Sequence, residues 1–135
     1  MFPDRDEASN DKVNVRNGLY PIWGPLHFFA RVNASGSPTN AKAAEVIGYL
    51  AGTRPTPAGV DLIKLEAQRH AIPQCAMRVR RTQEMGPTMP FAPTSACGCY
   101  YEKVATGSTD CKSCATSAEC PASAPVCSYG FCEPH

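Results

Sequence analysis

Cysteines are the residues of this sequence whose type and spacing could do chemistry. Seven of the eight lie close together near the carboxyl end, with the spacing C-x-C-x11-C-x2-C-x5-C-x6-C-x4-C. The eight are Cys75, Cys97, Cys99, Cys111, Cys114, Cys120, Cys127 and Cys132. Such a density of cysteines is typical of small disulfide-bonded modules that fold in an oxidising compartment.

Zinc binding is the alternative use of these thiols, and their spacing disfavours it. The sequence has one C-x-x-C pair, Cys111 and Cys114, and no second pair roughly 15–20 residues later, as a zinc ribbon would require. A thioredoxin-like role for the same pair lacks the βαβ surroundings of that motif. We therefore expect four disulfides, no metal and no other cofactor. About a hundred pairings are open, among which a bridge from Cys75 to Cys97 or Cys99 would pin the tail to the preceding region.

Catalytic signatures are missing from the sequence. There is no G-x-S-x-G, no H-E-x-x-H, and no pair of carboxylates that we could assign to acid–base chemistry. His27 and His70 stand alone, so we interpret both as structural residues rather than ligands. The sequence predicts a protein that is not an enzyme.

Bulk composition excludes two classes of partner. The chain has 135 residues, a net charge of +1 and 19% charged residues, which gives no reason to expect nucleic acid or an anionic membrane surface. No apolar run approaches the ~20 residues of a transmembrane helix. The first residues, MFPDRDEASNDK, lack the features of a secretory signal, although the cysteines indicate export. We expect a periplasmic or extracellular protein whose export signal lies upstream of Met1.

Of the segments that precede the cysteine-rich tail, Asn17–Val32 has the strongest apolar pattern. Leu26, Phe28, Ala30 and Val32 alternate with other side chains, which predicts a strand buried on at least one face. Residues 13–15 predict a short strand before it. Residues 1–12 are polar, and we expect them to be solvated.

Two helices and an edge strand are predicted after this strand. Thr39 or Asn40 is a good N-cap for a helix over residues 41–50, and Gly52 follows where a C-terminal glycine cap belongs. A second helix is predicted over residues 60–70, with Leu62 and Leu65 inward. Residues 74–80 predict an edge strand, whose arginines we interpret as solvated.

The sequence divides into three parts by composition. Residues 1–83 predict an α/β region, residues 84–96 a proline-rich linker, and residues 97–135 a cysteine-rich, loop-dominated module. A module of fewer than ~40 residues cannot hold itself together by apolar burial alone, so disulfides must stabilise it.

Residues 13–74 resemble the C-terminal part of phosphate-type periplasmic solute-binding proteins of ABC transporters. The matching residues are Gly18, Tyr20 and Pro21, followed by Leu26, the aromatic pair Phe28-Phe29, a loop and an amphipathic helix. Gly24 stands where the family often has a basic residue, and the cysteine-rich tail is no part of the usual family.

The resemblance implies part of a two-lobed, type II periplasmic-binding-protein fold. The partners it implies are the missing N-terminal lobe of the same protein, an ABC permease, and phosphate or a similar oxyanion. The family's ligand residues come from earlier parts of the chain and none maps here, so the ligand-binding residues stay unknown. Two alternatives remain open: a secreted cysteine-rich protein-interaction module, and a zinc-binding intracellular protein.

Overall fold

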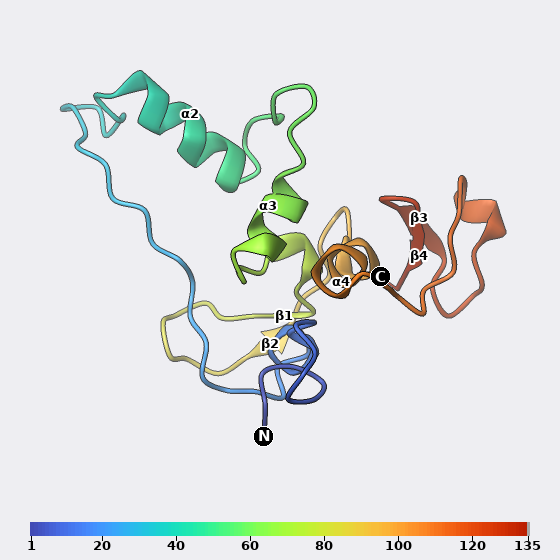
Figure 1. Cartoon of the computed structure of the whole chain (residues 1–135). Helices are drawn as coiled ribbons and strands as arrows, with labels where there is room; N and C mark the ends of the chain where they lie inside the picture. The colour runs from blue at the N-terminus through green and yellow to red at the C-terminus, as the bar shows by residue number, and fades with distance from the viewer. Residues whose placement is uncertain (135) are drawn as a thin grey trace. The chain divides into compact units, whose positions relative to one another are not determined.

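A computed structural model describes residues 1–134 of the chain (Figure 1). It is a small mixed α and β structure with many loops, and its strands form two antiparallel two-stranded sheets. The helical elements are α1 (Val13–Arg16), α2 (Ala41–Leu50), α3 (Leu62–Gln68), η1 (Gln74–Ala76), α4 (Gly98–Thr106) and η2 (Ser117–Glu119). The strands are β1 (Val79–Arg80), β2 (Met89–Pro90), β3 (Val126–Ser128) and β4 (Phe131–Glu133).

The described chain divides into two compact units. Unit 1 comprises residues 1–24 and 63–134, and unit 2 comprises residues 25–62. This division by contacts differs from the boundaries at residues 83/84 and 96/97 expected from composition. The cysteine-rich tail belongs to the same unit as the first residues of the chain, because both pack around helix α4.

The core of unit 1 lies between α3, η1 and α4. Its buried members are Ile63, Ala67, Ala76, Cys97 and Tyr101. The predicted inward face of α3 is wrong for Leu65, which is 49% exposed, whereas Ile63 and Ala67 face the core; Leu62 is partly buried. This helix is also shorter than the predicted 60–70, and it ends where His70 adopts a left-handed conformation with φ 57°.

The tail folds as helix α4 followed by the β3–β4 hairpin. Tyr129 and Gly130, both with positive φ, form the two-residue turn that matches the twist of a hairpin. Strand β4 packs against α4. Four disulfides join the elements of unit 1: Cys75–Cys97, Cys99–Cys111, Cys114–Cys127 and Cys120–Cys132.

Helix α2 of unit 2 confirms the prediction for residues 41–50. The side chain of Asn40 accepts hydrogen bonds from the backbone of Lys42 and Ala43, as an N-cap should. Gly52, with φ 67°, sits past the C-terminus, and the bonds Gly52 N to Tyr49 O and Thr53 N to Gly48 O complete a Schellman motif.

Three predicted segments have other structures. The strand predicted over Leu26–Val32 is wrong: in Figure 1 this stretch is an extended trace leading to α2, and Val32 alone pairs, in an isolated bridge with Pro38. Residues 13–15 are helical, and in residues 74–80 a 3-10 turn precedes the two-residue strand β1. Alternation favours a strand only where a second strand accepts its backbone bonds.

The first twelve residues are mostly exposed, as predicted, but hydrogen bonds to two buried carboxylates hold them in place. Asp4 accepts hydrogen bonds from the backbone and ammonium groups of Lys12, and Asp11 accepts from the backbone of Arg5 and Val13. Both carboxylates are buried, at 7% and 2% exposure. Short-range bonds of this kind fold the polar segment onto α1.

Candidate functional site

Gly18 and Tyr20, the first residues of the solute-binding-protein motif, form a tight turn after α1. Gly18 has φ 76°, and a Cβ there would lie 2.9 Å from Cγ1 of Val79. The backbone N–H groups of Leu19 and Tyr20 both donate to the carbonyl of Asn14, at 2.8 and 2.9 Å. Glycine is required here for two reasons, the left-handed backbone and the close approach of β1.

Pro21 and Trp23 are held by one arginine. The guanidinium of Arg81 donates to the carbonyl oxygens of Trp23 and Pro21, each at 2.6 Å, and its central carbon lies 4.5 Å from the Trp23 ring centroid. The interpretation of the arginines as solvated is therefore wrong for Arg81, which is half-buried, whereas Arg78 and Arg80 are exposed.

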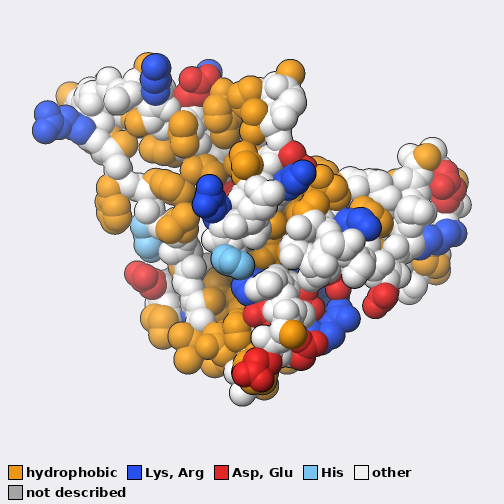
Figure 2. Space-filling view, viewed as in Figure 1, with side chains coloured by type: hydrophobic (Ala, Val, Ile, Leu, Met, Phe, Trp, Pro, Cys, Tyr) orange, Lys and Arg blue, Asp and Glu red, His pale blue; other side chains and the backbone are white. Residues whose placement is uncertain are grey.

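Leu26, the last motif residue, lies in the most exposed apolar stretch of the chain. Leu26 is 73% exposed, Phe28 50%, Phe29 94% and Val32 53%. In Figure 2 hydrophobic side chains, drawn in orange, are exposed in several groups on the face in view. Such a contiguous run is uncommon on a soluble protein without a partner.

Arg16 is the centre of a buried polar cluster in unit 1. It is 4% exposed, and its guanidinium donates to the carbonyl oxygens of Ala76 (3.1 Å), Asp11 (3.3 Å) and Gly98 (3.0 Å). Burial lowers the pKa of Arg16 from its ordinary value, while the charge of Glu102 opposes this shift. One side chain thus ties the N-terminal segment to η1 and to the start of α4.

Glu133 caps α4 from a distant part of the sequence. Cys97 supplies no side-chain cap, and Oε1 of Glu133 instead accepts the backbone N–H of Cys99 at 2.5 Å. A carboxylate is favoured at this end because of the helix dipole. Burial raises the pKa of Glu133 above its ordinary value, and the bond from Cys99 opposes the rise.

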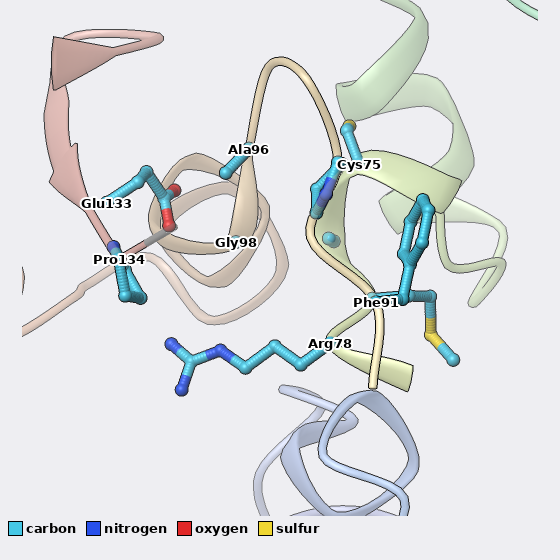
Figure 3. Close-up of a pocket in the computed structure, with 10 residues that line it drawn as sticks. Cys75, Arg78, Phe91, Ala96, Gly98, Glu133 and Pro134 are labelled. Carbon is cyan, nitrogen blue, oxygen red and sulfur yellow. The ribbon is translucent and has the colours of Figure 1, made fainter. Parts of the chain in front are cut away.

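A small pocket lies next to this cluster (Figure 3). Cys75 and Phe91 lie on one side of it and Ala96, Glu133 and Pro134 on the other, with Arg78 below them in Figure 3. The carboxylate of Glu133 is already bonded to Cys99, which leaves Arg78 as the charged side chain that could meet a ligand. One exposed arginine is too little to select an oxyanion, so the pocket does not assign a ligand.

The predicted disulfide candidates are all paired. Cys75 bridges to Cys97, one of the two partners expected for it, and this bond joins η1 to the start of α4. The sulfurs of Cys114, Cys120 and Cys132 lie within 4.8 Å of one another. They are the closest approach to a metal-type cluster in the described chain, but each already belongs to a disulfide. The four disulfides indicate an oxidising or extracellular compartment.

Sequence reasoning did not find Arg16 and Glu133, because each matters through contacts that span 82 and 34 positions of the sequence. The predicted motif residues Gly18, Tyr20 and Pro21 do come together, whereas Leu26 lies in unit 2. None of the helices in residues 1–134 is long and apolar enough to cross a membrane. Comparison with known protein families, curated proteins and solved structures found no significant match.

Proposed function

We propose that this chain is the C-terminal part of an exported phosphate- or oxyanion-binding protein of an ABC uptake system. In this proposal the chain is not catalytic and does not bind the anion by itself. The ligand site is made by an N-terminal lobe of the same protein, which delivers the anion to a membrane permease. The periplasm is the compartment that fits both this role and the disulfides.

The observation that carries the proposal is the missing core of unit 2. Residues 25–62, all of which the structure describes, contain apolar side chains throughout but bury only Gly48. Leu26, Phe28 and Phe29 are exposed, as is Val46 on helix α2. A segment that buries so little apolar surface cannot offset its own conformational entropy. It therefore needs another part of a protein to cover it, as the proposed lobe would.

The geometry of the motif residues gives further support. Gly18, Tyr20 and Pro21 lie in a turn whose shape requires glycine at position 18, which fits the role that the resemblance gives these residues. The turn leads directly into the apolar stretch from Leu26. In this proposal the uncovered extended segment after the turn is where the chain crosses from one lobe to the other.

Isothermal titration calorimetry with inorganic phosphate tests the proposal. We expect no heat of binding for these 135 residues, and binding with micromolar or tighter affinity for the protein extended through the reading frame upstream of Met1. Phosphate binding by the 135 residues alone would contradict the fragment interpretation. If the lengthened protein folds but binds none of phosphate, sulfate, arsenate and molybdate, the proposal that its ligand is an oxyanion is contradicted.

A secreted cysteine-rich interaction module is the second candidate. The observation in its favour is that unit 1 has its own core and four disulfides, and so is a complete scaffold. The two proposals differ in what lies upstream. A stop codon and ribosome-binding site directly before Met1 would favour the module, whereas an open frame of about one further lobe would favour the transport protein.

A further inference from the structure

The stretch Leu26–Val32 has the backbone of a strand without a neighbouring strand. It is extended, and its first backbone bond to another segment is at Arg31, whose carbonyl accepts from Thr39. The rings of His27 and Phe29 lie 6.3 Å apart between centroids, as expected for alternate residues on one side of an extended chain. The bridge between Val32 and Pro38 occupies one edge at the end of this stretch, so a second strand would pair along its other edge.

The sequence of this stretch is self-complementary about Phe29. Antiparallel pairing with a second copy places Leu26 opposite Val32, Phe28 opposite Ala30, and Phe29 opposite Phe29 of the second copy. Apolar residues thus meet apolar residues at every position except His27, which meets Arg31. By the two-fold symmetry this His27–Arg31 pair occurs twice, once on each side of the central Phe29 pair. Aromatic and β-branched pairs facing each other are those that stabilise antiparallel sheets.

We propose that this chain, in the absence of another covering segment, forms a homodimer by antiparallel pairing of Leu26–Val32 with the same segment of a second copy. The interface is two-fold symmetric and centred on Phe29. This inference goes beyond the proposed function, because it concerns the chain alone and does not depend on what covers the segment in a longer protein. A seven-residue interface is small, so the dimer is weak and depends on concentration.

Sedimentation velocity of the oxidised chain over a range of micromolar concentrations tests the dimer. Phe29→Lys and Phe29→Glu each place like charges opposite one another at the two-fold axis, and we expect the dissociation constant to rise at least about tenfold. Mixing the two variants brings Lys opposite Glu, and we expect the dimer to return. Since Phe29 is 94% exposed, neither substitution disturbs the folded monomer.

Met85→Lys and Met85→Glu are the matched controls, because Met85 is a large apolar residue of unit 1 that is 74% exposed. They should leave the dissociation constant unchanged. A chain that stays monomeric over the whole range would overturn the proposal. A dimer that ignores both Phe29 substitutions, or one that the mixture does not restore, would overturn it equally. Phosphate binding by a longer protein is unaffected by any of these outcomes.

Discussion

Units 1 and 2 differ in what holds them together, although both contain helices of ordinary sequence. Unit 1 buries a core around Tyr101, ties its ends together through Arg16, and carries all four disulfides. Unit 2 contains α2, the best-capped helix of the chain, and yet Gly48 is the only buried residue among residues 25–62. Well-formed local structure is therefore no measure of how far a region is folded by its own contacts.

The difference has a simple physical origin. The caps of α2 come from residues within a few positions of its ends, and such bonds form without tertiary contacts. Yet Val46 on the same helix is 52% exposed, and Gly48 is the only residue of α2 that is buried. In unit 1 the reverse holds, since Glu133 caps α4 from a strand more than thirty positions away. The units differ in where their stabilising contacts come from.

Arg16→Met should cause the largest loss of stability among the substitutions that compare the two units. It leaves the carbonyl oxygens of Ala76 and Gly98 buried without their donor, and we expect unit 1 to lose about 3 kcal/mol of unfolding free energy. Denaturant titration followed by circular dichroism measures the loss. Arg31→Met, at an exposed position of unit 2, is the control and should change the transition by less than about 0.5 kcal/mol. Equal effects of the two changes would contradict the importance of the buried cluster.

Gly18→Ala and Gly36→Ala compare two left-handed glycines, one from each unit. Gly18 has φ 76° and faces Val79 at 2.9 Å, whereas Gly36 has φ 79° and nothing within 4 Å of the added Cβ. We expect Gly18→Ala to destabilise unit 1 by about 2 kcal/mol, of which about 1 kcal/mol is backbone strain. Gly36→Ala should leave the unfolding transition of unit 1 in place. The same titration reports both, and a silent Gly18→Ala would contradict the close packing of the turn on β1.

His70→Gly should have the smallest effect and the opposite sign. His70 has φ 57° at the end of α3, where Ala71 N donates to Glu66 O in a Schellman motif. Glycine removes the strain of a side chain in the left-handed region, so we expect unit 1 to gain about 0.5–1 kcal/mol. Thermal unfolding measures the gain. His70→Ala keeps the strain and serves as the control. A gain in stability from both changes would show that relief of backbone strain is not the cause.

The sequence predicted those features that depend on contacts between residues close together in the chain. Helix α2 was predicted at both ends because Asn40 and Gly52 act locally. The eight disulfide-bonded cysteines, and a bridge from Cys75 into the tail, were also predicted, since density and an odd count in the tail are visible in the sequence.

The rest depends on partners that the sequence does not show. The strand prediction for Leu26–Val32 came from a real alternation, but a strand also needs a neighbouring strand, and the described chain provides one contact at Val32. The polar cluster around Arg16 and Glu133 could not be predicted, because a single buried arginine looks the same in a sequence as an exposed one. The pairing of the remaining cysteines was also not predictable, because Cys114–Cys127 and Cys120–Cys132 depend on the hairpin and Cys99–Cys111 on the position of α4.

Amide hydrogen exchange on the oxidised chain, at a concentration low enough to keep it monomeric, measures whether unit 1 is stabilised by its own contacts and unit 2 is not. We expect strong protection in α4 and the β3–β4 hairpin of unit 1, and exchange in α2 at rates close to those of an isolated peptide helix. Protection of α2 equal to that of α4 would contradict this expectation, because unit 2 would then be stabilised without a covering partner.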